Sequence, residues 1–118
     1  MRKKVFLIVI YCLVMFFTAS LTHATIYVAN SWGNSILTWP DNATGNTAPT
    51  TNITGGATTL NGPFGVAVDA NWIYVGNENN ASIDIFPING TGNIAPTRSI
   101  QGAATTLNTP DGVAVDAN

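Results

Sequence analysis

The stretch GVAVDANWIYVGN, residues 65–77, predicts two β-strands joined by a tight turn. Its apolar residues alternate or cluster in short runs, a spacing that favours strands over helices. We expect one strand over residues 65–69 and a second over residues 72–77. Ala70 and Asn71 would form a two-residue hairpin between them, in which the asparagine tolerates a left-handed backbone.

The pattern continues on the C-terminal side into two more strands. SIDIF, residues 82–86, predicts a third strand, and the more polar PTRSI, residues 96–100, predicts a fourth. Pro96 has no N–H group to donate, so a strand that begins there is tolerated only at the edge of a sheet. The fourth strand should therefore be the outermost of a four-stranded antiparallel unit.

This unit occurs twice in the sequence. GVAVDAN recurs at residues 112–118, and residues 25–71 align without a gap over residues 72–118, with 29 of 47 positions identical. A fixed period of this length predicts a supersecondary unit that buries its apolar face against copies of itself. Four antiparallel strands with an apolar first and a polar last strand are typical of a β-propeller blade. We expect an all-β chain with two propeller repeats, 25–71 and 72–118.

Several motifs resemble a known family of propellers. PFGVAVD at 63–69, IYVGN at 73–77 and SIDIF at 82–86 resemble the NHL repeat, while YVAN at 27–30 and YVGN at 74–77 resemble the related YVTN repeats. The resemblance covers both repeats and implies the propeller fold. It implies no single activity, because such propellers serve as binding platforms, lactonases and lyases.

The N-terminus has the features of an export signal. Arg2, Lys3 and Lys4 precede the apolar run 5–17, and small residues follow up to Ala24. The run is shorter than the ~20 residues that a membrane-spanning helix needs. We expect residues 1–24 to be a cleaved signal peptide that leaves no membrane anchor, and the protein to be secreted, either periplasmic or extracellular.

The composition of residues 25–118 excludes several function classes. Arg98 is the single basic residue against six acidic ones, a balance of the wrong sign for binding nucleic acid. These residues also include no Cys, His or Lys. A Ser-His-Asp triad, a cysteine nucleophile, a Schiff-base lysine and a zinc site of Cys or His are therefore impossible within them.

Metal-dependent catalysis stays open as an alternative. A calcium site needs ~6 to 8 oxygen ligands, and Asp69 and Asp116 are the carboxylates that recur in both repeats. An aspartate just before a two-residue turn also has a simpler role, because its side chain caps the turn. We expect capping and no cofactor, with calcium as the alternative.

Candidate binding residues are those at which the two repeats differ, because shared residues mainly build the fold. In a propeller the loop after the second strand and the loop entering the next first strand lie on one face. Trp32 and Phe64 would share this face in the first repeat, and Glu78, Asn79 and Asp111 in the second. Exposed aromatics beside acidic and amide groups suit a sugar ring or an apolar partner. The alternative is that Trp32 merely covers the edge of its sheet.

Two functions follow from these observations. The first is an exported, non-catalytic β-propeller module that binds a protein or a glycan. The alternative is a fragment of a metal-dependent lactonase-like or lyase-like propeller enzyme. Residues 25–28 read as a second strand and residues 112–116 as a first strand, so the two ends complement each other. The chain would be either a piece of a longer gene product or one subunit of a head-to-tail ring of three chains.

Overall fold

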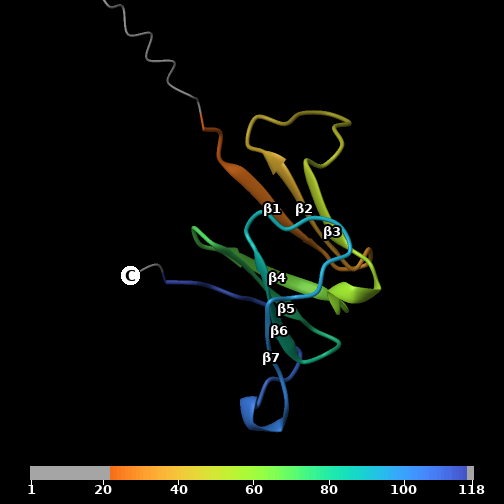
Figure 1. Ribbon diagram of the computed structural model, residues 1–118, viewed down its shortest axis with the longest axis vertical. Coiled ribbons are helices and arrows are strands. Elements are labelled where there is room, and N and C mark those ends of the chain that lie inside the picture. The colour runs from red at the N-terminus through yellow and green to blue at the C-terminus, as the bar shows by residue number, and fades with distance from the viewer. Residues whose placement is uncertain (1–21, 117–118) are drawn as a thin grey trace, which may run out of the picture.

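The computed structural model describes residues 22–116 and confirms the predicted all-β class (Figure 1). Helical structure within this range is limited to two single 3-10 turns, η1 (Gly56–Thr58) and η2 (Ala103–Thr105). Neither turn has the length or apolar character that crossing a membrane would require. Residues 1–21, most of the predicted signal peptide, lie outside the described residues, as do residues 117–118.

The strands form two antiparallel sheets, the first above the second in Figure 1. The first sheet has three strands in the order β1 (Thr25–Asn30), β2 (Ser35–Pro40) and β3 (Thr51–Thr54). The second has four strands in the order β4 (Pro63–Val68), β5 (Trp72–Asn77), β6 (Ser82–Pro87) and β7 (Arg98–Ile100). Each strand therefore pairs with its neighbours in sequence, as the short connections require.

Most of the predicted strands are found close to their expected positions. The strand expected over 72–77 has those bounds as β5, and β4 and β6 differ from their predicted ranges by one or two residues. β7 is outermost as expected but begins only at Arg98. The strand predicted over 112–116 is wrong: this segment belongs to neither sheet, and near Gly65 it packs on the face of β4 rather than along the edge of a strand.

The hairpin between β4 and β5 has the predicted loop and cap but differs from the prediction in one backbone conformation. Ala70 and Asn71 do form its two-residue loop, since Val68 pairs with Ile73 and the Asp69 N–H donates to the Trp72 carbonyl at 3.1 Å. The left-handed backbone expected of Asn71 is wrong, because neither loop residue has a positive φ. The carboxylate of Asp69 accepts the backbone N–H groups of Asn71 at 2.7 Å and Trp72 at 2.8 Å and so caps the turn, as predicted.

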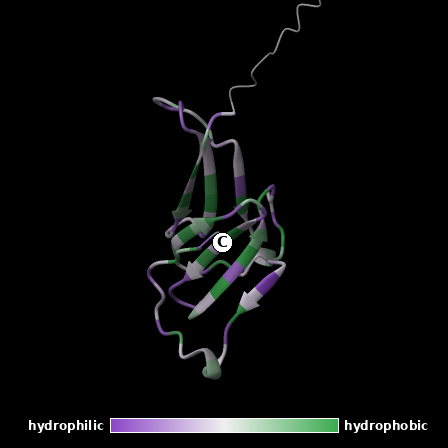
Figure 2. Cartoon of the chain, turned by 90° about the vertical axis from the view of Figure 1, so that its left-hand side faces the viewer, coloured by the Kyte–Doolittle hydropathy of each residue, from purple (hydrophilic) through white to green (hydrophobic). Residues whose placement is uncertain are grey.

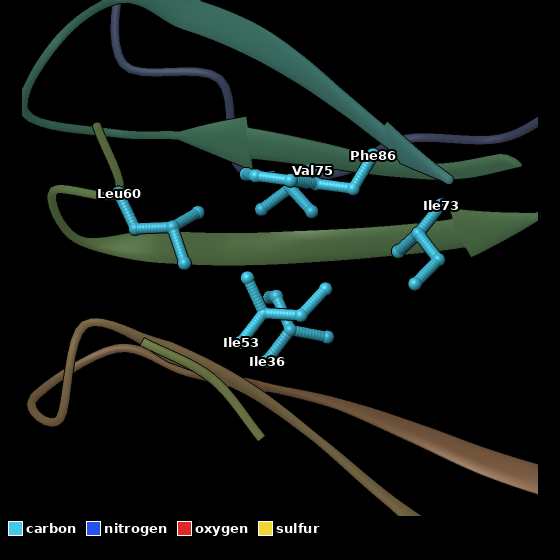
Figure 3. Packing of buried hydrophobic residues seen from close by; sticks show 6 residues of the cluster. All are labelled: Ile36, Ile53, Leu60, Ile73, Val75 and Phe86. Atoms are coloured by element: carbon cyan, nitrogen blue, oxygen red, sulfur yellow. The ribbon is translucent and has the colours of Figure 1, made fainter. Parts of the chain in front are cut away.

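The core lies between the two sheets. Strands alternate their side chains between two faces, and each sheet places one apolar face toward the other. Figure 3 shows Ile36 and Ile53 facing Val75 and Phe86 across this interface. The six side chains of the cluster are buried: Ile36, Ile53, Leu60, Ile73, Val75 and Phe86. Burial of each contributes about 1.5–3 kcal/mol, so this contact is a main source of stability. Figure 2 shows hydrophobic (green) segments on the strands of both sheets, interrupted by hydrophilic (purple) ones.

A buried carboxylate ties the second sheet to the segment that connects it with the first. Asp84 on β6 is only 1% exposed and accepts three hydrogen bonds. The donors are Thr59 Oγ1 at 2.8 Å, Asn77 Nδ2 at 2.7 Å and Ser99 Oγ at 2.6 Å. A buried carboxylate is tolerated only when its oxygens are satisfied in this way. The network holds the segment after η1 against β5 and β6.

Candidate ligand-binding pocket

A pocket of about 410 Å³ opens where loops of the two sheets meet. It is lined by the β1–β2 loop, the connection before β4, the start of β4 and the β5–β6 loop. The lining residues are Ser31, Trp32, Asn34, Asn61, Gly62, Phe64, Glu78 and Asn79. Four of the five residues predicted from the repeat differences, all except Asp111, therefore come together in one place.

The two aromatic residues stand at the surface of this pocket. The side chain of Trp32 is fully exposed, at 101% of its reference area, and that of Phe64 is 58% exposed. The alternative interpretation, in which Trp32 folds over the edge of its sheet, is therefore wrong. An exposed indole offers a flat apolar face and an N–H donor at little cost in side-chain entropy, so it can bind a ligand by stacking.

Gly62 joins the two sides of the pocket. Its N–H donates to Asn34 Oδ1 at 2.8 Å, which links it to the loop of the first sheet. Its carbonyl accepts the N–H of Glu78 at 2.9 Å, which links it to the loop of the second sheet. The φ of Gly62 is 61°, and a Cβ atom there would lie 2.6 Å from Asn79 Nδ2. A glycine is favoured here because a side chain would be strained at this φ and would push against the Asn79 amide.

A chain of side-chain amides orders the polar wall of the pocket. Asn79 Nδ2 donates to Asn61 Oδ1 at 3.2 Å, Asn61 Nδ2 donates to Asn80 Oδ1 at 2.9 Å, and Asn80 Nδ2 donates to the Thr59 carbonyl at 2.9 Å. The Asn61 N–H also donates to Asn77 Oδ1 at 3.2 Å, which connects this wall to the buried carboxylate network. The amides are therefore held in place before any ligand arrives.

Glu78 supplies the charge of the pocket, since the other lining residues are uncharged. Its side chain is only partly buried and its backbone is fixed by Gly62. A carboxylate accepts hydrogen bonds from hydroxyl or N–H groups of a ligand and donates none when ionised. The pocket thus combines two apolar faces with a set of acceptors and a few amide donors.

Asp111 lies apart from the other predicted residues. It is exposed and is not among the residues that line the pocket. Its carbonyl oxygen is 2.8 Å from the position that a Cβ atom of Gly65 would occupy, so its backbone passes alongside β4. The pocket is built between the two sheets, whereas Asp111 follows the second sheet in sequence. Its role in binding stays a prediction.

The sequence comparison missed four lining residues. Ser31, Asn34 and Gly62 differ from their counterparts Glu78, Ala81 and Thr109, so the same rule of divergence could have found them. Asn61 has an identical counterpart, Asn108, and no difference marks it. Its position in the pocket is visible only in three dimensions.

Asp69 and Tyr74 form a separate polar group at the β4–β5 turn. The backbone N–H of Asn71, the Tyr74 hydroxyl at 2.8 Å and the backbone N–H of Trp72 hold the pKa of Asp69 below its usual value. The same hydrogen bond to Asp69 raises the pKa of Tyr74. This is the geometry expected of a turn cap. Residues 22–116 bring together no group of three or more His, Cys, Asp or Glu side chains suited to a metal ion.

The pocket is suited to recognition of a ligand with both apolar and hydroxyl surfaces, because aromatic faces and ordered amides stand side by side. Comparison of the chain with protein-family models, with curated proteins and with solved structures gave no match.

Proposed function

We propose that this chain is an exported, non-catalytic module of the β-propeller type that binds a glycan through the pocket beside Trp32 and Phe64. The observation that carries the proposal is the fully exposed indole of Trp32 at a pocket that also holds Glu78 and Asn79. Sugar rings have apolar C–H faces and a rim of hydroxyls. They need an aromatic platform together with fixed polar groups, and the pocket provides both.

Two further features support the fold and export parts of the proposal. The second sheet has four antiparallel strands with its shortest strand outermost, and the two sheets pack face to face through apolar side chains, as propeller blades do. Thr22, His23 and Ala24 at the expected cleavage site are exposed and precede β1 without regular structure. A protease could reach a site of this kind.

A glycan array with the unsubstituted chain and with Trp32→Ala and Phe64→Ala variants tests the proposal. Truncation of a stacking aromatic should weaken binding by about 1–3 kcal/mol, which is roughly 5- to 150-fold. Val68→Ala is the matched control, because Val68 is also exposed and lies on β4 but does not line the pocket. It should bind like the unsubstituted chain.

Two results would redirect this proposal. If binding survives the loss of both aromatics, the pocket is not the binding site. If the chain captures a protein partner through Trp32, the ligand is a protein and not a glycan. The lactonase-like or lyase-like alternative makes a different prediction, since a bound metal stabilises the folded state. A rise in melting temperature at millimolar calcium would favour it, and an unchanged melt would count against it.

A further inference from the structure

Residues at equivalent positions of the two repeats have different surroundings. Those on β5 are buried at the contact between the sheets, and those on β1 are exposed on the outer face of the first sheet. Ile73 and Val75 on β5 are 1% and 0% exposed, because they pack against the first sheet. Their counterparts 47 positions earlier, Ile26 and Val28 on β1, are 44% and 38% exposed. The first sheet therefore presents outward the same apolar side chains that the second sheet uses to bind it.

The second sheet shows the complementary pattern. Ile53 on β3 is 1% exposed within the contact, whereas its counterpart Ile100 on β7 is 48% exposed. Ile53 reaches over Gly90, so that a Cβ atom on this glycine would lie 3.2 Å from Ile53 Cδ1. Ile53 is thus a projecting side chain seated against the loop between β6 and β7, whereas the equivalent Ile100 is half-exposed.

A pocket at the equivalent repeat positions lies on the outer side of the first sheet. A pocket of about 270 Å³ is lined there by Ile26, Trp39, Ala43, Thr44, Gly45 and Thr47. These positions correspond to Ile73, Phe86, Gly90, Thr91, Gly92 and Ile94, the region that receives Ile53. The aromatic residue is retained as Trp39 in place of Phe86, and the pocket is large enough for an isoleucine side chain.

Backbone hydrogen bonds at the existing contact can also be repeated. Gly92 donates its N–H to the Asn52 carbonyl at 2.7 Å and accepts the Thr54 N–H at 3.1 Å, so that it pairs with the outer edge of β3. Gly92 has a φ of 74°, and its counterpart Gly45 has a φ of 65°. Gly45 therefore has the backbone shape needed to pair with the outer edge of β7, where Ile100 lies.

From these correspondences we propose that a second copy of this chain docks head to tail onto the first. Ile100 of one copy inserts into the pocket beside Ile26 and Gly45 of the next, as Ile53 does within the chain. A surface that pairs with a different surface on an identical copy forms a heterologous interface. Such contacts repeat from copy to copy until a ring closes. The partner for the outer faces of both sheets is a second copy of this chain, because the chain already contains one example of the same contact.

The segment 112–116 would complete this contact. It repeats the sequence of residues 65–69, and Val113 Cγ2 lies 3.2 Å from the position that a Cβ atom of Gly76 would occupy. β1 forms the edge of a three-stranded sheet, at the place where β5 receives β4. Docking would bring residues 112–116 beside β1 of the next copy, adding a fourth strand and covering an open edge.

The test measures the oligomeric state of the exported full chain by light scattering after size-exclusion chromatography. The unsubstituted chain should associate, and a ring of three copies is the closed form expected from the repeat. Ile100→Asp removes the projection and Ala43→Arg fills the pocket, so each variant alone should be monomeric. We expect each to weaken association by about 100-fold or more. Val68→Asp is the control for exchanging an exposed apolar residue for an acid, and it should associate normally, because Val68 lines neither the ligand pocket nor the pocket beside Ile26.

Mixing the two monomeric variants gives the decisive result. The Ile100→Asp copy keeps an intact pocket and the Ala43→Arg copy keeps Ile100, so the mixture should form a one-to-one dimer. Circular dichroism checks that each variant is folded, and Ile100→Lys replaces Ile100→Asp if the latter is not. A folded, monomeric unsubstituted chain would overturn the proposal. So would a mixture that stays monomeric, or a native complex in which a different polypeptide occupies these faces.

Discussion

Ile53 and Ile100 are the same amino acid at the same position of the two sequence repeats, yet their surroundings differ. Ile53 is 1% exposed in the core between the sheets, whereas Ile100 is 48% exposed on the outer face of β7. Replacing each with alanine removes the same atoms. The two variants therefore measure how much of the stability of this protein comes from the contact between its sheets.

The expected magnitudes follow from this difference in burial. Ile53→Ala removes buried methyl groups and leaves a cavity between Ile36 and the second sheet, which should lower the free energy of unfolding by about 2–5 kcal/mol. Ile100→Ala removes half-exposed groups and leaves no cavity, so about 0.5–1.5 kcal/mol is expected. The two variants should differ by about 2 kcal/mol, which moves the urea midpoint by about 1 M.

Urea unfolding followed by tryptophan fluorescence measures both values. The experiment is done at protein concentrations low enough to keep separate copies apart, and Val68→Ala serves as a control for an exposed strand residue. Equal losses of stability from Ile53→Ala and Ile100→Ala would refute the reasoning, because they would mean that the sheets do not depend on this contact. At higher concentration the effect of Ile100→Ala should grow if copies associate through this residue.

Three further predictions concern polar groups and backbone strain. Asp84→Ala removes the shared acceptor of three hydrogen bonds, one of them from the buried Asn77 amide, and should lower the free energy of unfolding by about 1–3 kcal/mol in urea. Exposed Asp111→Ala should change it by less than about 0.5 kcal/mol. Gly62→Ala should lower the free energy of unfolding by about 1–2 kcal/mol and weaken ligand binding, because the φ of Gly62 is positive and the new side chain would push against Asn79. Normal ligand binding in a titration of this variant would contradict the prediction. The pKa of Asp69 is lowered in the folded state, so ionised Asp69 stabilises the fold above the ordinary aspartate pKa, and this stabilisation is lost as pH falls through the lower folded value. Thermal melts between about pH 2 and 7 measure this effect. The melting temperature of Asp69→Asn should fall less steeply toward low pH than that of the unsubstituted chain.

The candidate site could be predicted from the sequence only in part. Differences between the two repeats pointed to Trp32, Phe64, Glu78 and Asn79, because residues that build the common fold stay the same while surface loops are free to diverge. The same rule placed Asp111 in the site, although the pocket forms between the two sheets and Asp111 does not line it. The rule also passed over Asn61, because its counterpart Asn108 is identical, although only Asn61 lines the pocket. A comparison of repeats identifies loops, but it does not identify which loops meet.

The local structure of the chain was determined by the sequence itself, because alternation of side chains and turn residues act over a few positions. β5 has the predicted bounds for this reason, and Ala70–Asn71 form the predicted hairpin loop. Burial was decided only by the tertiary structure. Residues 65–69 and 112–116 have one sequence, but residues 65–68 belong to β4 while residues 112–116 belong to neither sheet. The cause is physical: a strand needs the hydrogen bonds of a neighbouring strand, and an apolar side chain becomes core only where another surface covers it.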